Sequence, residues 1–446
     1  MSKALLILAD GTVFEGSSFG AEGCVIGETV FTTGMNGYIE TLTDPSYYGQ
    51  IVTQTFPLIG NYGDIPADYE SAKCNVRGYI VRQWCTEPSN FRCGGDVDSY
   101  LRTQNIIGLC GIDTRQLTKI LREAGVMNGM IVSGTSKEAL EIFAAADAAK
   151  ADALSGKNKN AEPAALSSVL EKIRAYKIQN AVESVTGSAT GVELPADVVF
   201  AESAEYRFVP VTAGGTKIND SALAMKDGKG KKVVLWDFGA KANIRRELLK
   251  RGLDVVTVPC SYTAQQIMAL NPDGIMLSNG PGDPAENTGI IEEIKKLLKT
   301  GTPIFGICLG HQLLALANGA QTMKLKYGHR GANQPVKYVK TGRVYISSQN
   351  HGYAVRNETL PNGAVLSFVN TNDGTCEGLT YTNVPAFSVQ FHPEACSGPL
   401  DTSFLFDEFV KLINNHDYFK NFKAEYERVD AISYFASTIK QTKAKA

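Results

Sequence analysis

The first third of the chain shows a strand-like hydrophobic pattern. The apolar run Ala4–Leu8 is followed by Asp10-Gly11 and then by a second short run at residues 12–14. An Asp-Gly pair between two runs of this length is typical of a tight β-hairpin. Strand-like runs recur at residues 49–56 and 78–84, separated by Gly, Pro and Asn. The pattern therefore predicts a strand-rich N-terminal domain.

One helix interrupts this strand-rich region. Between Thr114 and Ala124 the apolar residues recur every three or four positions, which is the period of a helix with one buried face. Asp113 can accept a hydrogen bond from the first turn, and Gly125 suits the position just beyond the last turn. We expect this helix to pack against the strands.

The period of the pattern changes from Lys231 onwards. Strands are predicted at residues 233–236, 254–258, 274–277 and 303–307, and helices at residues 242–250, 264–270, 290–299 and 311–317. Later strands are predicted at residues 344–347, 365–368 and 386–390, and a closing helix at residues 404–413. Strands that alternate with helices are typical of a parallel sheet with crossover connections. The predicted fold class is therefore α/β, with a doubly wound, mostly parallel sheet in the C-terminal part and a strand-rich mixed α/β domain before it.

These patterns predict four segments along the chain. The N-terminal domain covers residues 1–137, and the doubly wound domain covers residues 231–420. Residues 138–230 combine an Ala-rich helical run with polar stretches that contain Gly, and we interpret them as a linker or insert. Residues 421–446 are expected to form a loosely ordered tail.

The composition narrows the functional class. Of the 446 residues, 43% are hydrophobic and 20% are charged, which is ordinary for a packed globular protein. Lys and Arg (44) nearly balance Asp and Glu (46), so the strong positive field of a dedicated nucleic-acid binder is missing. No apolar stretch reaches the roughly 18 residues that a membrane span needs, and no secretory signal pattern is seen. We expect neither nucleic acid nor a membrane as a partner.

The spacing of the cysteines indicates the cellular compartment and whether a metal site is expected. Nine cysteines are spread over the chain without a C-x-x-C pair, which argues against a disulfide framework and a Cys-rich zinc site. The chain also lacks H-E-x-x-H or a comparable metal-ligand spacing. We predict no metal in this chain and a reducing, cytoplasmic location.

Cys308 stands in a context that suits a nucleophile. It follows the apolar strand 303–307 and precedes a helix, with Gly306 and Gly310 on either side. Small neighbours permit the sharp strand-to-helix turn called a nucleophile elbow, which presents the side chain at the carboxyl edge of the sheet and turns backbone amides toward an oxyanion. The start of a helix also favours a thiolate. The alternative is a buried cysteine in a tight β-to-α turn.

A thiol nucleophile needs a base, and the chain offers five histidines: His311, His329, His351, His392 and His416. His392 ends an apolar run, and Glu394, two residues later, falls on the same side of an extended segment. There its carboxylate can fix the tautomer of the imidazole. The alternative is a strand-end histidine beside a solvated glutamate. His311 and His351 are expected to orient loops or to pack, whereas His329 and His416 carry no functional signal.

Two polar loops follow other predicted strands. Ser278-Asn-Gly-Pro-Gly-Asp-Pro284 concentrates Gly and Pro where backbone N–H groups could face a substrate, and Asn350-His-Gly-Tyr353 is similar. Either loop could also be an ordinary polar turn. Asp237-Phe-Gly239 spells the magnesium triplet of protein kinases, but the remaining kinase motifs and the Walker A pattern are absent.

The segment around Cys308, the run Phe391–Glu394 and the two loops together resemble class I, triad-type glutamine amidotransferases. The N-terminal part resembles the small-subunit family of carbamoyl phosphate synthetases through Gly34-Met-Asn-Gly-Tyr38, residues 40–47, Gly60-Asn-Tyr-Gly63 and Gly111-Ile-Asp-Thr-Arg115. Asp237-Phe-Gly-Ala-Lys241 matches the same family. The resemblance covers about residues 1–137 and 231–415, while the segment between them departs from the family pattern.

The resemblance implies a catalytic triad of Cys308, His392 and Glu394. It also implies a set of substrate contacts: the backbone of Gly280, Gly282 and Leu309 around the substrate carbonyl, and Ser46, Gln312, Asn350, Gly352 and Tyr353 around the rest of glutamine. Tyr353 stands where the family often has Phe, a change that a contact through the backbone would tolerate. Because Ser46 belongs to the N-terminal domain, the resemblance implies a glutamine site closed by both domains.

The resemblance further implies an activity shared between two subunits. The small chain would hydrolyse L-glutamine through a Cys thioester, and ammonia would pass through a channel to a large synthetase subunit. That subunit would use ATP, magnesium and bicarbonate to make carbamoyl phosphate for arginine and pyrimidine synthesis, so no cofactor is expected in this chain. The alternatives are an amidotransferase that feeds another synthase, a stand-alone γ-glutamyl hydrolase and a catalytically silent regulatory subunit.

Overall fold

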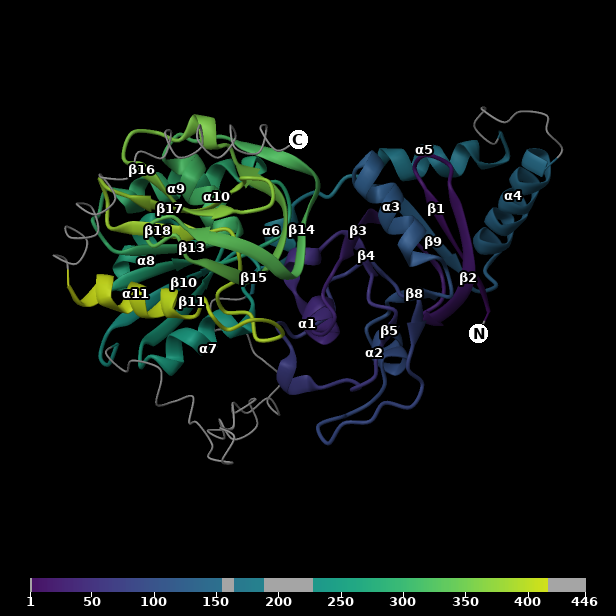
Figure 1. Ribbon diagram of the computed structural model, residues 1–446, viewed down its shortest axis with the longest axis horizontal. Helices are drawn as coiled ribbons and strands as arrows, with labels where there is room; N and C mark the ends of the chain where they lie inside the picture. Colours follow the sequence, from purple (N-terminus) through teal and green to yellow (C-terminus); the bar gives the residue numbers. More distant parts are fainter. Residues whose placement is uncertain (1, 155–163, 188–227, 416–446) are drawn as a thin grey trace. The chain divides into compact units, whose positions relative to one another are not determined.

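The computed structural model describes residues 2–154, 164–187 and 228–415 (Figure 1). It divides into two compact units, residues 1–181 and 182–446. Each unit has its own sheet and its own hydrophobic core. Within the described residues, no helix is both long enough and apolar enough to cross a bilayer.

Seven strands of the N-terminal unit close into a barrel. Their order around it is β1 (Lys3–Leu8), β2 (Val13–Gly20), β8 (Ile107–Cys110), β6 (Gly78–Ile80), β4 (Gln50–Gln54), β3 (Cys24–Thr32) and β9 (Met127–Ser133), and β9 pairs with β1. The predicted hairpin is confirmed, because β1 and β2 pair antiparallel around Gly11, which has a φ of 90°. The closure of the barrel was not predicted, because pairing between strands far apart in sequence leaves no local pattern.

Shorter elements complete the N-terminal unit. They are α1 (Tyr38–Thr43), α2 (Val97–Thr103), α3 (Thr114–Ala124) and the two-stranded sheet of β5 (Leu58–Ile59) and β7 (Gln83–Trp84). Helix α3 is confirmed with its predicted bounds. The Asp113 carboxylate accepts a hydrogen bond from the Gln116 backbone N–H at 2.9 Å, and Gly125 follows the last turn with a φ of 100°.

Two helices from the predicted linker belong to the N-terminal unit. They are α4 (Lys137–Leu154) and α5 (Ser167–Ala175). Apolar residues at helical spacing in α4, such as Ala139, Ile142 and Ala146, share one buried cluster with Leu5 and Ile7 of β1. Because this face needs the barrel to cover it, the unit extends to residue 181 and does not end near residue 137. Residues 155–163 and 188–227 of the predicted linker, and the predicted tail, lie outside the described residues.

The C-terminal unit contains a nine-stranded sheet. Its order is β11 (Asp254–Pro259), β10 (Lys232–Asp237), β12 (Gly274–Leu277), β13 (Ile304–Ile307), β18 (Ala386–Val389), β17 (Cys376–Tyr381), β16 (Ala364–Asn370), β14 (Thr322–Tyr338) and β15 (Val344–Val355). The first five strands pair in parallel, as predicted. The others pair antiparallel. The long strand β14 was not predicted, because its mixture of Lys, Gly, Asn and Pro has no apolar period.

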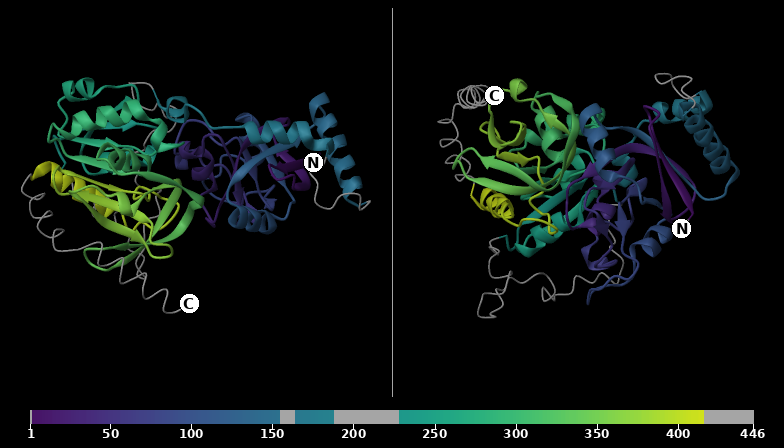
Figure 2. Two further views of the ribbon diagram at one scale, coloured as in Figure 1. Left: turned by 90° about the horizontal axis from the view of Figure 1, so that it is seen from above. Right: turned by 45° about the vertical axis from the view of Figure 1, so that its right-hand side comes forward.

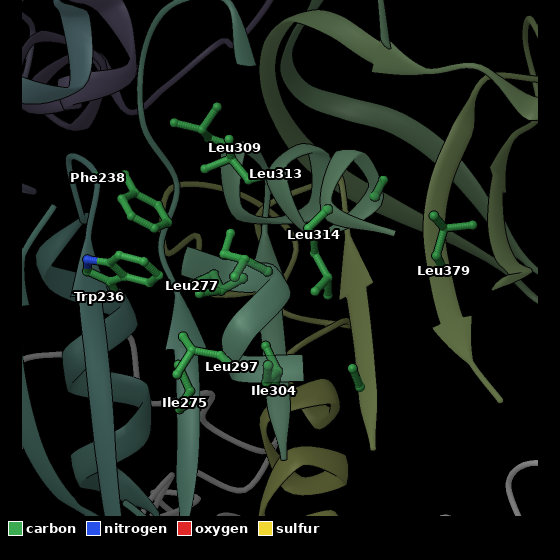
Figure 3. Close-up of a cluster of buried hydrophobic side chains, with 14 of the residues drawn as sticks. Trp236, Phe238, Ile275, Leu277, Leu297, Ile304, Leu309, Leu313, Leu314 and Leu379 are labelled. Carbon is green, nitrogen blue, oxygen red and sulfur yellow. The ribbon is translucent and has the colours of Figure 1, made fainter. Parts of the chain in front are cut away.

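Helices cover both faces of this sheet, so the doubly wound architecture is confirmed (Figures 1 and 2). One face packs against α8 (Ala264–Ala269), α9 (Thr288–Leu298) and α10 (Leu309–Ala317), and the other against α7 (Ala242–Lys250) and α11 (Phe404–Asn414). Figure 3 shows the first core, where Trp236 and Leu277 of the strands meet Leu297 of α9 and Leu313 of α10. Burial on both faces explains why the parallel strands are apolar at successive positions.

Arg251 joins α7 to α11. Its guanidinium group contacts carboxylate oxygens of Glu247 and Asp407 at 2.6 Å each, and it lies 5.2 Å from the ring centroid of Phe406. We expect Arg251→Met to lower the free energy of unfolding by about 3 kcal/mol, because it removes the buried guanidinium group that compensates the buried Glu247 and the partly buried Asp407. Urea unfolding measures the loss.

Lys250→Met is the matched control for Arg251→Met. Lys250 contacts the same Glu247 at 3.7 Å but is partly exposed, and partly solvated pairs of this kind are worth less than about 1 kcal/mol. Equal losses in the two variants would contradict a special role of Arg251.

Candidate active site

Cys308 occupies the turn between β13 and α10. Its φ of 53° and ψ of −103° are values that a residue with a side chain adopts only under strain. Its backbone N–H donates to the Val389 carbonyl at 2.9 Å, which ties the turn to β18. Helix α10 begins at Leu309, directly after Cys308 and two residues earlier than predicted. The structure thus contains the strained strand-to-helix turn expected of a nucleophile elbow.

Two glycines allow α10 to approach the sheet closely. A Cβ atom on Gly310 would lie 2.4 Å from the carbonyl oxygen of Leu277, and one on Gly306 would lie 2.7 Å from the carbonyl oxygen of Gly310. Both distances are too short for a carbon atom, so neither position can carry a side chain without movement of the helix. The small residues around Cys308 are therefore a packing requirement of the elbow.

His392 and Glu394 form a buried pair. Nδ1 of His392 lies 2.7 Å from Oε1 of Glu394, and both side chains are about 1% exposed or less. The backbone N–H of His392 donates to the Ser348 carbonyl at 2.9 Å. A carboxylate acceptor at Nδ1 places the N–H on that nitrogen and leaves Nε2 for proton exchange. Nε2 is buried and has no hydrogen-bond partner within the described part of the chain.

The charges around His392 favour its protonated form. Burial by itself would lower its pKa, and Lys241 acts in the same direction, but Glu394 and Cys308 outweigh both and raise the pKa of His392 to about 10. Burial alone would raise the pKa of Glu394, but His392 and Lys241, whose Nζ is 3.6 Å from Oε1, hold it below its usual value. An imidazolium that is already present at neutral pH can act as a general acid.

Strict alternation along the strand brings these groups together. Phe387, Val389 and Phe391 point into the core beneath α7 and α11. The intervening Ser388 and Gln390 carry polar groups that contact α10 and Cys308, the residue before it, and His392 follows them in the same alternation. Ser388 Oγ lies 2.8 Å from Nδ1 of His311, and Gln390 contacts both Cys308 and Gln312. One face of the segment therefore supplies apolar packing. The other supplies polar groups, of which Ser388 holds His311 and Gln390 contacts the nucleophile.

Two segments meet Cys308 or its neighbours: residues 350–353 of β15 and the loop that follows β12 at residues 278–284. The Asn350 carbonyl lies 3.8 Å from Sγ of Cys308, and the Tyr353 carbonyl accepts a hydrogen bond of 2.7 Å from the Gln312 amide. The contact at Tyr353 thus runs through its backbone. In the loop after β12, a Cβ on Gly280 would lie 2.3 Å from the Phe238 carbonyl oxygen, and Gly282 has a φ of 89°.

The backbone of α10 also offers a donor. As the first residue of the helix, Leu309 has no intrahelical acceptor for its N–H, which leaves this group available to an oxyanion. Gly352, like the rest of residues 350–353, lies on β15, so the polar turn predicted after residue 347 is wrong: the strand continues to Val355. Ser46 belongs to the N-terminal unit, where its N–H bonds the Asp44 carboxylate at 2.9 Å. The contacts of all these residues with glutamine stay predictions.

Known protein families match both the N-terminal and the C-terminal unit of the chain. Residues 6–131 match the family described as carbamoyl-phosphate synthase small chain, CPSase domain, and residues 234–412 match glutamine amidotransferase class-I. A carbamoyl phosphate synthase small chain from Clostridium perfringens is 45% identical over 409 residues, which cover 92% of this chain and 99% of the relative. The chain belongs to the carbamoyl phosphate synthase small-chain family. The resemblance inferred from the motifs is confirmed.

Further small chains are similar to this protein over almost its whole length. A small chain from Vibrio vulnificus is 44% identical and covers 93% of this chain and 100% of its own length, and one from Salmonella typhi is 43% identical with 93% and 98% covered. A solved structure of a glutamine amidotransferase from Thermotoga maritima has 17% identity and a TM-score of 0.31, and the match covers 47% of this chain and 97% of that one.

Sequence reasoning missed two side chains that this small-chain site contains. Lys241 contacts Glu394, and Gln390 contacts Cys308. In the sequence, Lys241 stood out only as the last residue of the Asp237–Lys241 motif. Gln390 could have been found from the alternation of residues 387–392, because it falls on the same face as His392. His311 packs as expected: it is fully buried beside Ser388, and burial lowers its pKa to about 3, so it stays neutral.

His329 is part of a buried charge cluster that the sequence did not reveal. Its Nε2 lies 2.8 Å from Asp373 and its Nδ1 lies 3.4 Å from Glu377. Gln349 donates to Glu377 at 3.0 Å and its Oε1 lies 3.1 Å from Nε2 of His351. The cluster therefore connects β14 to β15, the strand that contains residues 350–353.

The same cluster contains a group that could offer metal ligands. Ligand atoms of His329, His351 and Glu377 lie within 4.8 Å of one another, and all three residues are buried. Each side chain already contacts other protein groups, such as Asp373, Tyr353 and Gln349. An internal ion pair accounts for this arrangement, and the expected absence of a metal stays a prediction.

The glycine requirement of the elbow yields a stability prediction. We expect Gly310→Ala to lower the free energy of unfolding by about 2 kcal/mol, because the new methyl group would force α10 away from β12. Gly289→Ala is the control: a Cβ there meets nothing within 4 Å, and removing a helical glycine should stabilise by about 0.5–1 kcal/mol. Chemical denaturation measures both, and a Gly310→Ala protein as stable as the parent would contradict the packing argument.

The His329 cluster predicts a pH dependence. Burial by itself would lower the pKa of His329, but hydrogen bonds to Asp373 and Glu377 raise it from 6.5 to about 9. The stabilisation from this charge is therefore complete below pH 6.5 and is lost as the pH rises through about 9. We expect His329→Gln to be less stable than the parent by about 1–3 kcal/mol at pH 7 and the difference to shrink markedly at pH 10.

Urea unfolding followed by Trp236 fluorescence, with Trp84→Phe in every protein, reports on the C-terminal unit. His311→Gln is the control, because His311 is neutral across this range and its effect should not change between pH 7 and 10. A His329→Gln deficit that persisted unchanged at pH 10 would contradict the charge argument.

Proposed function

We propose that this chain is the glutamine-hydrolysing component of a carbamoyl phosphate synthetase and supplies ammonia to a large synthetase subunit. The observation that carries the proposal is the strained elbow at Cys308 beside the buried His392–Glu394 pair. Membership of the small-chain family supports the identity of the synthetase. The match at residues 6–131 argues against a different synthase and against a stand-alone hydrolase, and the complete triad argues against a silent subunit.

In the first half of the reaction, the Cys308 thiolate attacks the side-chain carboxamide carbon of L-glutamine. The protonated His392 beside the sulfur favours the negative charge on it. The backbone N–H of Leu309 stabilises the oxyanion, with Gly280 and Gly282 lining the same side. His392 then gives its proton to the departing nitrogen, so that ammonia leaves and a γ-glutamyl thioester remains.

In the second half, His392 is neutral and accepts a proton from water. The resulting hydroxide attacks the thioester, the thiolate departs, and glutamate and the imidazolium are formed. Glu394 holds Nδ1 throughout and stabilises the positive charge. Within the C-terminal unit, Gln312, Asn350, Gly352 and Tyr353 hold the substrate glutamine.

The chemistry of ammonia explains why this chain would need a partner subunit. In water it would be protonated and cease to be a nucleophile, so the product must travel through a protected path to the large subunit of a heterodimer. That subunit would bind ATP and magnesium and form carbamoyl phosphate from bicarbonate, which feeds arginine and pyrimidine synthesis in the cytoplasm. This chain itself would need no cofactor.

The test compares the chain with Cys308→Ala, each alone and co-purified with the large subunit. We expect Cys308→Ala to abolish glutamine hydrolysis and glutamine-dependent carbamoyl phosphate synthesis, because no other group can form the thioester. Synthesis from added ammonia should be spared, because the large subunit then needs no glutaminase. Glutamate release and carbamoyl phosphate formation are the measured quantities.

Cys260→Ala is the matched control. Cys260 is also buried and also follows a strand of the parallel sheet, at the end of β11, so its substitution should leave both activities within about twofold of the parent, as expected for a small core change. Loss of ammonia-dependent synthesis in Cys308→Ala would overturn the division of labour. Absence of glutamine hydrolysis by the parent, even with the large subunit, would favour a silent subunit.

A further inference from the structure

Gln390 is buried beside the nucleophile. Its side chain is fully shielded from solvent, and its Nε2 lies 3.6 Å from Sγ of Cys308, within the range of an N–H to sulfur hydrogen bond. Its Oε1 lies 2.9 Å from Nε2 of Gln312. It therefore contacts both the nucleophile and a residue expected to hold glutamine.

The hydrogen-bond pattern fixes which atom of Gln390 faces the sulfur. The Tyr353 carbonyl can only accept, so the atom of Gln312 that lies 2.7 Å from it must be the amide nitrogen. The same nitrogen faces Gln390, whose nearer atom must then be the oxygen. The remaining end of the Gln390 amide, which faces Cys308, is consequently the N–H donor.

We propose that Gln390 is a positioning residue that orients the sulfur of Cys308 and stabilises its negative charge through an N–H donor. The role rests on the proposed function and deepens it. A buried N–H group directed at a developing anion stabilises that charge without having to reorganise. A neutral amide can do this without competing with His392 for the sulfur, as a second cation would.

The second end of the amide adds a connection to the substrate. Gln312 donates to both the Tyr353 carbonyl and Gln390. A chain of hydrogen bonds thus runs from Tyr353 of β15, through Gln312 and Gln390, to Cys308. Glutamine bound by this part of β15 and by Gln312 would meet a sulfur already held in a fixed position, which is the geometric basis of a high effective concentration.

Two substitutions separate the two ends of the amide. Gln390→Met keeps the length of the side chain but removes the donor and the acceptor. Gln390→Glu keeps an oxygen toward Gln312 and replaces the N–H that faces the sulfur with a second oxygen. Ser388→Ala is the matched control, because it removes a buried hydrogen bond from the same strand face, to His311, without touching the sulfur.

The first readout is the rate at which iodoacetamide alkylates Cys308 in the full-length chain, followed by peptide mass spectrometry. We expect Gln390→Met and Gln390→Glu to slow it by about tenfold or more, the effect of losing a buried hydrogen bond to a charged group. The alkylation rate of Ser388→Ala should stay within about twofold of the parent, because this substitution leaves the contacts of Cys308 in place. The control thus separates loss of the Gln390 contact from a general loosening of the strand. Parent-like rates in both Gln390 variants, or an equal slowing in Ser388→Ala, would overturn the proposal.

The second readout is glutamine hydrolysis by the complex with the large subunit. In Gln390→Glu we expect kcat to fall while KM changes little, because Gln312 keeps its acceptor. In Gln390→Met we expect kcat to fall and KM to rise. A change in KM alone, with kcat equal to that of the parent in both variants, would overturn the positioning role. If the parent does not hydrolyse glutamine but alkylation still slows in the Gln390 variants, the proposed function fails while the role of Gln390 at the thiol stands.

Discussion

The close approach of α10 to the parallel strands is the constraint on which the site depends. With no Cβ at Gly306 or Gly310, the helix begins immediately after β13, and the chain must reverse within one residue. That residue is Cys308, which takes a positive φ. The strain is balanced by packing of Leu309 and Leu313 into the apolar core. The nucleophile is therefore held by the same contacts that stabilise the sheet.

The segment that ends in His392 shows how a polar site can be built into an apolar sheet. Its alternation keeps Phe387, Val389 and Phe391 in the core and turns Ser388, Gln390 and His392 toward α10. Buried polar groups destabilise a fold unless they find partners. Here Ser388 contacts His311 of α10, Gln390 contacts Gln312 and Cys308, and His392 contacts Glu394. The requirement for hydrogen bonding therefore also helps to place the residues of the site.

Buried charges in the C-terminal unit are balanced locally. Glu394 lies between His392 and Lys241, Arg251 between Glu247 and Asp407, and His329 between Asp373 and Glu377. Removing one member of such a set leaves an uncompensated charge, which destabilises far more than the loss of a surface pair. In the first set, the balance also keeps His392 protonated at neutral pH.

Local pattern was enough to predict much of this protein. The hairpin around Gly11, helix α3 with its cap at Asp113, the five parallel strands and the turn at Cys308 all follow from short-range periods and from residues that permit special backbone angles. The pairing of His392 with Glu394 was also predicted and is observed, but not for the predicted reason: instead of an extended segment, Pro393 and Glu394 lie in a turn, in which the Ala395 N–H donates to the His392 carbonyl. The barrel closure, β14, the place of α4 on β1, the His329 cluster and the contact of Gln390 with Cys308 were not predictable. They join residues that are distant in sequence, and only the packing of the folded chain decides which of these meet.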